Sequence, residues 1–102
     1  MSFDGTEGEF YTPREAGEFT RRYRLANINP IHGGFIGREK IEKILENDDC
    51  VGVRVYLGLD EDNTMNFVFV GTDAEQNDIM NVIVERIPKC PPNCSSLNEL
   101  NS

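Results

Sequence analysis

The chain of 102 residues has no tryptophan, a single histidine and only three cysteines. An odd number of cysteines cannot pair completely within one chain, and cysteines in a reducing compartment stay free or bind metal. No stretch approaches the ~20 consecutive apolar residues that a membrane-spanning helix needs. The start, "MSFDGTEGEFYTP", has neither the basic nor the apolar region of a secretory signal. We therefore expect a cytoplasmic protein that does not enter a membrane.

Basic residues are also scarce. Ten lysines and arginines stand against 18 acidic residues, which gives a formal net charge of −8. Such a field repels the phosphate backbone of nucleic acids, so we expect no nucleic-acid partner. Hydrophobic residues make up 38% and charged residues 27%, a balance typical of a small globular domain with a modest core.

The pattern along the chain predicts three segments. Residues 1–11 form a flexible acidic lead-in, residues 12–88 form an α+β domain, and residues 89–102 form an irregular tail rich in Cys, Pro, Ser and Asn. Within the domain, "INPIHGGFIG" contains Pro30 and three glycines and is expected to be a loop.

Two helices are predicted. The first begins at Pro13, because Thr12 can cap its N-terminus and Glu15 completes a capping box. The second covers about residues 37–47, where isoleucine and leucine recur on one helical face.

The strongest pattern is strict alternation in "CVGVRVYLGL", followed by the polar turn "DEDNT" and the alternating run "MNFVFVG". Two alternating runs joined by a short polar loop predict a β-hairpin. Residues 79–87, "IMNVIVERI", fit either a helix or a strand, and their β-branched content favours a third strand.

Together these elements predict an α+β fold in which two helices pack on a small antiparallel sheet within a single domain. We expect the aliphatic side of the first strand to be shielded by the helices. Arg54 and Tyr56 would lie on the opposite side, where they form either a partner-binding patch or an ordinary sheet face with Arg54 paired to an acid. The open sheet edges favour association with a protein partner or with a second copy as a homo-oligomer.

The histidine and the cysteines allow a different function. His32, Cys50, Cys90 and Cys94 make up the Cys₃His ligand set of many structural zinc sites, although only Cys90 and Cys94 are close in sequence. The alternatives are a Cys90–Cys94 disulfide or redox pair, and inert thiols, which the sequence favours. Cys50 could also act as a nucleophile with His32 as its base, but no third orienting residue is identifiable.

Three stretches, "HGGFIGREKIEKILENDDCVGVRVYLGLDEDN", "FVFVGTDAEQNDIM" and "CPPNC", define a layout of His, helix, Cys, strand and a closing Cys-Pro-Pro-x-Cys. This layout resembles a group of small bacterial proteins of unknown function, so the resemblance implies no activity. The sequence therefore predicts a non-enzymatic binding or structural module that acts through protein–protein contacts and needs no cofactor. The alternative is a zinc-binding or thiol-redox module, and an enzyme ranks last.

Overall fold

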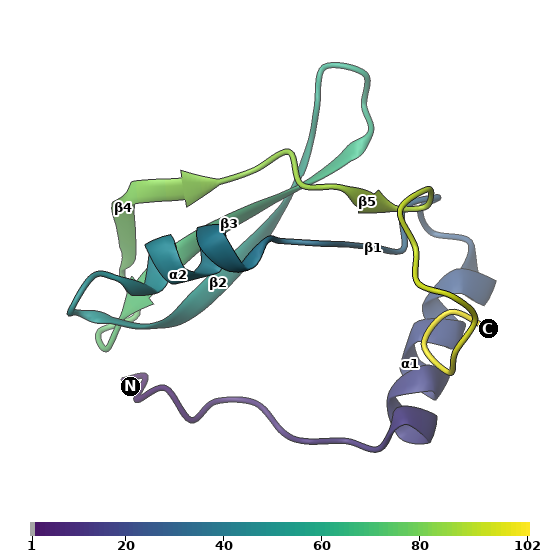
Figure 1. The fold of residues 1–102 in the computed structure, drawn as a ribbon, viewed down its shortest axis with the longest axis horizontal. Helices are drawn as coiled ribbons and strands as arrows, with labels where there is room; N and C mark the ends of the chain where they lie inside the picture. The colour runs from purple at the N-terminus through teal and green to yellow at the C-terminus, as the bar shows by residue number, and fades with distance from the viewer. Residues whose placement is uncertain (1) are drawn as a thin grey trace. The chain divides into compact units, whose positions relative to one another are not determined.

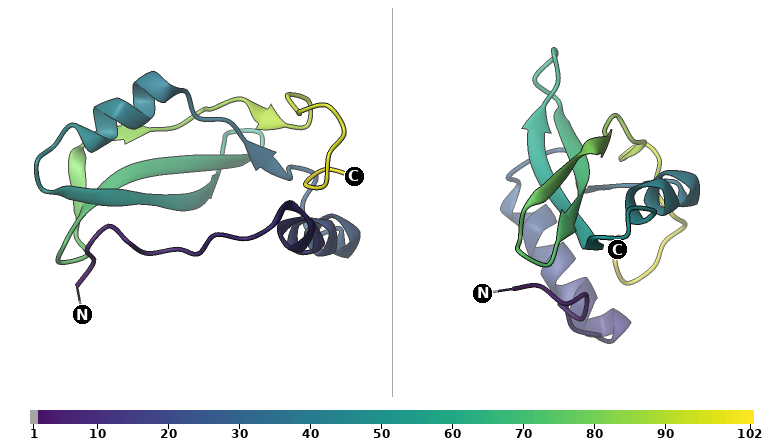
Figure 2. Two further views of the ribbon diagram at one scale, coloured as in Figure 1. Left: turned by 60° about the horizontal axis from the view of Figure 1, so that its bottom comes forward. Right: turned by 90° about the vertical axis from the view of Figure 1, so that its left-hand side faces the viewer.

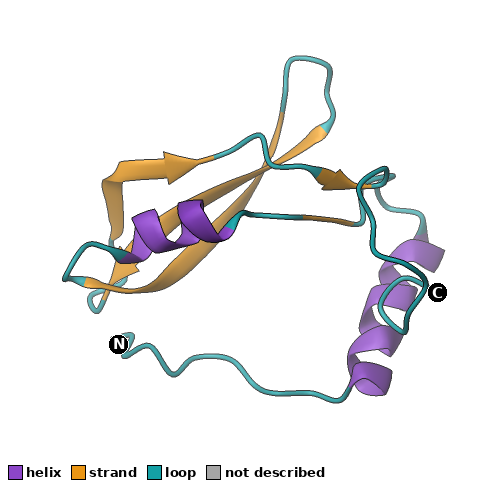
Figure 3. Cartoon of the chain, viewed as in Figure 1, coloured by secondary structure: helices purple, strands orange, loops and turns teal. Residues whose placement is uncertain are grey.

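The computed structural model describes residues 2–102. The elements in chain order are α1 (Pro13–Ala26), β1 (Gly33–Gly34), α2 (Arg38–Leu45), β2 (Cys50–Leu59), β3 (Met65–Asp73), β4 (Asp78–Val84) and β5 (Lys89–Cys90) (Figures 1 and 3). Two helices with small antiparallel sheets confirm the predicted α+β class. The chain divides into a sheet unit, residues 2–7 and 36–87, and a helix–tail unit, residues 8–35 and 88–102.

The sheet unit is built on the predicted hairpin. Its three strands lie in the order β2-β3-β4, and Tyr56 is opposite Val68 while Leu57 is opposite Phe67. Both hairpin turns close by short backbone hydrogen bonds, from Asp60 N to Thr64 O at 2.9 Å and from Asp73 N to Asn77 O at 3.0 Å. The alternating pattern and the polar turn "DEDNT" therefore predicted the β2–β3 hairpin correctly.

Residues 79–84, from the segment that fits both a helix and a strand, lie in β4. The preference for a third strand is therefore confirmed. Its ladder with β3 shifts register between the pairs Val70–Ile83 and Gly71–Ile79. A bulge of this kind bends the strand and interrupts its pairing.

Helix α2 packs on the sheet at one end. A Cβ atom built on Gly71 of β3 would lie 3.2 Å from Ile44 Cγ2 and 2.9 Å from Cys50 Sγ, so this glycine allows the helix to approach closely. An eight-residue helix is about 12 Å long, whereas a ten-residue strand is about 33 Å long. The helix is therefore too short to cover the hairpin along its length, as Figure 2 shows.

The core of the sheet unit is small. Ile44, Val70 and Ile87 are the buried apolar side chains among residues 2–102, with exposed fractions of 3%, 2% and 8%. Ile44 belongs to α2, Val70 to β3 and Ile87 to the segment after β4. Val70 is opposite Arg54, so it lies on the side of the sheet away from the helix. Much of the remaining apolar surface stays in contact with water.

The helix–tail unit contains α1, which begins as predicted. The side chain of Thr12 accepts a hydrogen bond from Glu15 N at 3.2 Å, and Pro13 occupies the first turn. The helix ends at Asn27, whose left-handed conformation (φ 55°) lets its N–H bond back to Arg24 O.

Strands β1 and β5 form a short antiparallel ribbon in the same unit, with Gly33 opposite Cys90 and Gly34 opposite Lys89. Hydrogen bonds from His32 N to Cys90 O and from Phe35 N to Pro88 O, both 2.8 Å, extend it at each end. Parts of the expected loop and of the expected irregular tail are therefore paired. Neither has the alternating side chains that predict a strand, so the sequence gives no sign of this pairing.

Candidate functional site

An exposed apolar row follows one side of β2. It consists of Val53, Val55, Leu57 and Leu59, with exposed fractions of 42%, 50%, 68% and 64%. Val53 is opposite Gly71, the glycine that faces α2, so the row lies on the helix side of the sheet beyond the end of the helix. The prediction that this side is shielded is wrong for these four residues, because α2 reaches Gly71, opposite Val53, but is too short to cover the strand beyond it.

The same strand is an edge of the sheet, since β2 pairs with β3 alone among the described strands. The start of the chain lies against the first part of β2, where a Cβ atom built on Gly5 would lie 3.2 Å from Val51 O. From residue 53 onward the strand combines an open edge with an apolar side. We name residues 53–59 the β2 edge segment.

Arg54 and Tyr56 lie on the opposite side of β2, and both contact Asp78 at the start of β4. Arg54 Nη1 donates to Asp78 Oδ1 at 2.6 Å and to Gln76 O at 3.2 Å. The Tyr56 hydroxyl donates to the other oxygen of the same carboxylate. The carboxylate of Asp78 on β4 therefore accepts hydrogen bonds from two side chains of β2, although β3 lies between these two strands.

This arrangement stabilises the ionised form of Asp78. The hydrogen bond from Tyr56, followed by the charge and hydrogen bond of Arg54, lowers the pKa of Asp78 from its ordinary value of 3.8, while desolvation opposes the shift. Above this pKa the carboxylate is fixed in place by both donors.

Phe3 adds a contact on this side of the sheet. Its N–H donates to Ala74 O at 2.8 Å, and the guanidinium of Arg54 lies 5.9 Å from the centre of its ring. These contacts agree with the interpretation that Arg54 is paired to an acid. Nearly half of Tyr56 nevertheless stays exposed. A partner-binding role for Arg54 and Tyr56 stays a prediction.

Cys90 and Cys94 form a disulfide, with their Cα atoms 4.9 Å apart. The intervening turn is closed by a 2.8 Å hydrogen bond from Asn93 N to Lys89 O, which brings the two cysteines within the usual Cα distance of a disulfide. The preference for inert free thiols is therefore wrong for this pair. Cys50 is the free cysteine, and its thiol donates to Gly52 O at 3.1 Å.

The candidate zinc ligands are divided between the two units. Cys50 belongs to the sheet unit, whereas His32, Cys90 and Cys94 belong to the helix–tail unit. The His32 ring makes an edge contact with Tyr23, with ring centres 6.2 Å apart. Residues 2–102 contain no group of three or more His, Cys, Asp or Glu side chains arranged to hold a metal ion. Zinc binding and a nucleophilic Cys50 with His32 as base stay predictions, and zinc would require reduction of the disulfide because thiolates are the ligands.

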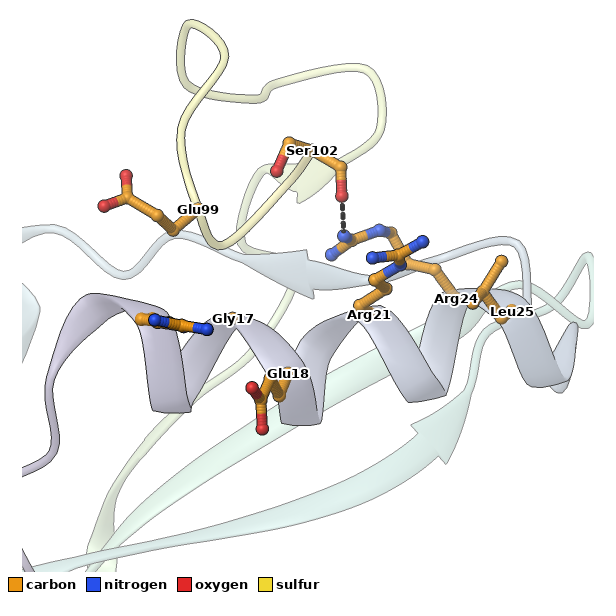
Figure 4. Close-up of a pocket in the computed structure, with 8 residues that line it drawn as sticks. Gly17, Glu18, Arg21, Arg24, Leu25, Glu99 and Ser102 are labelled. Carbon is orange, nitrogen blue, oxygen red and sulfur yellow. Dashed lines mark hydrogen bonds between the residues drawn. The ribbon is translucent and has the colours of Figure 1, made fainter.

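A shallow pocket lies between α1 and the tail (Figure 4). Its lining residues are Arg14, Gly17, Glu18, Arg21, Arg24, Leu25, Glu99 and Ser102. Arg24 closes one side by donating to Leu100 O and Ser102 O. Charged side chains of both signs line the pocket. The two hydrogen bonds from Arg24 attach the tail to α1.

The sequence pattern located β2 but did not predict that its aliphatic side is exposed. The aliphatic side meets solvent, and the Arg54 side is in part occupied by residues of the same chain. The short length of the predicted second helix was the available signal, because an element of three turns cannot cover a ten-residue strand.

No family model, curated protein or solved structure matches this chain. Among the described residues, no helix combines the length and the hydropathy needed to cross a bilayer. The fold and the β2 edge segment define a small α+β protein with an open, apolar sheet edge.

Proposed function

We propose that this protein is a non-enzymatic binding module that acts through protein–protein contacts and associates with itself along the β2 edge segment. The carrying observation is the exposed row of Val53, Val55, Leu57 and Leu59 beside an unpaired strand edge. An edge of this kind is a template for another strand. Natural monomers usually shorten, charge or cover such edges, and residues 55–59 carry no charged side chain.

The energetics support a reversible association. Full burial of an aliphatic side chain contributes about 1.5–3 kcal/mol, and about half of that is available to side chains that are already half-buried. Four such side chains from each of two copies supply roughly 6–12 kcal/mol, before backbone hydrogen bonds are counted. This only offsets the estimated 4–15 kcal/mol cost of losing rigid-body freedom, so the net affinity comes from the backbone hydrogen bonds. We expect a weak, reversible association with a dissociation constant between about 1 µM and about 1 mM.

Charge acts against association. Each copy carries a formal net charge of −8, so two copies repel each other at low ionic strength. Salt screens this repulsion and leaves the apolar contact intact. Association is therefore expected to strengthen between low and physiological salt.

The test is light scattering at protein concentrations from about 1 µM to about 1 mM, where affinities of this size are measurable. Leu57→Lys places a charge in the apolar row and is expected to weaken association roughly thirtyfold, a loss of about 1 kcal/mol in each copy. Met80→Lys is the matched control, because Met80 lies on the other edge strand and is equally exposed, at 68%. Circular dichroism verifies that both variants fold.

A strictly monomeric wild type across this range would overturn self-association. Equal weakening by the two lysine variants would show that the contact does not depend on the β2 edge segment. We also propose a cytoplasmic location, which is tested by fractionation of cells that produce the chain.

The disulfide favours a second candidate function, a thiol-redox module based on Cys90 and Cys94. A disulfide in a reducing compartment is typically transient or redox-sensing. Thiol counting under denaturing conditions, after equilibration in glutathione buffers, would show whether the pair cycles near cellular potentials. Zinc content measured on the reduced protein and on Cys94→Ser would test the metal-binding alternative.

A further inference from the structure

Resting on the proposed function, we infer that β2 pairs with β2 of one second copy, antiparallel, about a two-fold axis that passes at Tyr56. The β2 edge segment is free from residue 53 to residue 59, and Tyr56 is its midpoint. Pairing about the midpoint uses every free position of the edge in both copies. The three-stranded sheets then join as one six-stranded sheet with the two β2 strands at its centre.

The side chains match in this register. Val53 lies opposite Leu59 of the second copy, and Val55 lies opposite Leu57. Directly opposed residues of an antiparallel pair share one side of the sheet, so all four apolar side chains of each copy meet the four of the other. The exposed apolar rows of the two copies thereby cover each other.

The charges also match. Arg54 lies opposite Gly58 of the second copy, which has no side chain to obstruct the guanidinium and its bond to Asp78. Asp60, at the end of the strand, lies opposite Gly52. No like charges face each other across the two central strands.

Registers with the axis nearer the start of the strand fit less well. An axis at Arg54 would place the two Arg54 side chains directly opposite each other, which is destabilising. An axis at Val55 would place Leu59 opposite Val51, where the residue 5 backbone already lies against the strand.

The assembly closes at two copies. An isologous contact uses the same strand in both copies, so no β2 edge remains to recruit a third. The other edge strand, β4, is a poor template because its ladder is interrupted by the register shift between Ile83 and Ile79.

The experiment is site-directed disulfide trapping in the full chain. Cys50→Ser removes the free thiol, and the Cys90–Cys94 disulfide is retained. Protein carrying Val53→Cys is mixed with protein carrying Leu59→Cys, oxidised mildly, and analysed by mass spectrometry without reduction. The mixed 53–59 product is expected to form at least tenfold faster than either homodimer, because equivalent positions lie about 20 Å apart in this register.

Two comparisons fix the register and the edge. A mixture of Val53→Cys with Leu57→Cys is expected to cross-link more slowly than the 53–59 mixture, and faster 53–57 linkage would overturn the register. Met80→Cys on β4 is expected to stay monomeric under the same oxidation, and its cross-linking would overturn the choice of edge.

Light scattering on the chain without substitutions separates the proposed self-association from the proposed register. A mass of twice 11.5 kDa with 53–59 linkage supports both. The same mass with linkage at other positions overturns this inference and leaves self-association in place. A monomer at every concentration overturns both, and a mass that keeps growing with concentration overturns closure at two copies.

Discussion

The two compact units are stabilised in different ways. The sheet unit has a long hairpin, a third strand and a helix that packs directly against Gly71. The helix–tail unit has a two-residue ribbon, a disulfide and hydrogen bonds from Arg24 to the tail. Strand pairing and apolar packing therefore stabilise one unit, whereas a covalent link and polar contacts stabilise the other.

This difference explains where the open surface occurs. In the sheet unit, the hairpin is longer than the helix that covers it, so the excess strand length exposes its apolar side. In the helix–tail unit, the tail lies on the helix closely enough that a Cβ atom on Gly17 would be 2.4 Å from Glu99 O. A substitution within one unit is therefore expected to leave the other unit unchanged.

The largest effect is expected from Gly71→Val. The new side chain would collide with Ile44 and Cys50, and overpacking of this kind costs typically 1–3 kcal/mol. Thermal unfolding followed by circular dichroism should show the loss, while amide exchange in α1 stays unchanged. Gly52→Ala is the control, because a Cβ there meets no atom within 4 Å. Equal losses from both variants would contradict the packing argument.

Removing the disulfide should affect the other unit. The double variant Cys90→Ser, Cys94→Ser is expected to lose about 2 kcal/mol, the chain-entropy value for closing a loop of about five residues. Faster amide exchange is expected in the β1–β5 ribbon, while β2 and β3 keep their protection. Loss of protection throughout the chain would show instead that the units unfold together.

Gly17→Ala is expected to separate helix stability from tail attachment. Alanine stabilises a helix interior by about 1 kcal/mol relative to glycine, but here its Cβ would collide with the backbone at Glu99. We expect α1 to remain helical and residues 95–102 to move away, which amide NMR shifts of Leu100 and Asn101 would report. Gly33→Ala, where a Cβ meets no atom within 4 Å, should leave those shifts unchanged.

The smallest effect concerns pH. The folded pKa of Asp78 lies below its ordinary value of 3.8, so its carboxylate stabilises the sheet unit above about pH 4. This contribution is lost as the pH falls through the folded pKa. Asp78→Asn is therefore expected to be less stable than wild type at neutral pH, with a difference that shrinks below about pH 4 in chemical unfolding. A difference that stays constant across this range would show that the ionised form contributes nothing.

Much of the fold could be predicted because its signals are local. Thr12, Pro13 and Glu15 define the start of α1 through contacts that span three residues. The alternation in β2 and β3 and the polar turn between them define the hairpin, and the β-branched residues of β4 favoured a third strand. Each of these depends on side-chain chemistry and spacing within one short segment.

The candidate site depended on tertiary structure. That α2 covers Gly71 but does not reach Leu57 and Leu59 follows from where the helix docks, which no local pattern specifies. The bond between Arg54 and Asp78 joins residues on β2 and β4 across the intervening strand, and the ribbon joins Gly33 to Cys90 from distant parts of the chain. The sequence by itself determined the elements, because propensity, capping and turn chemistry act between neighbouring residues. Only the tertiary structure decided which apolar side chains stay exposed, because burial depends on the lengths and positions of elements far apart in the chain.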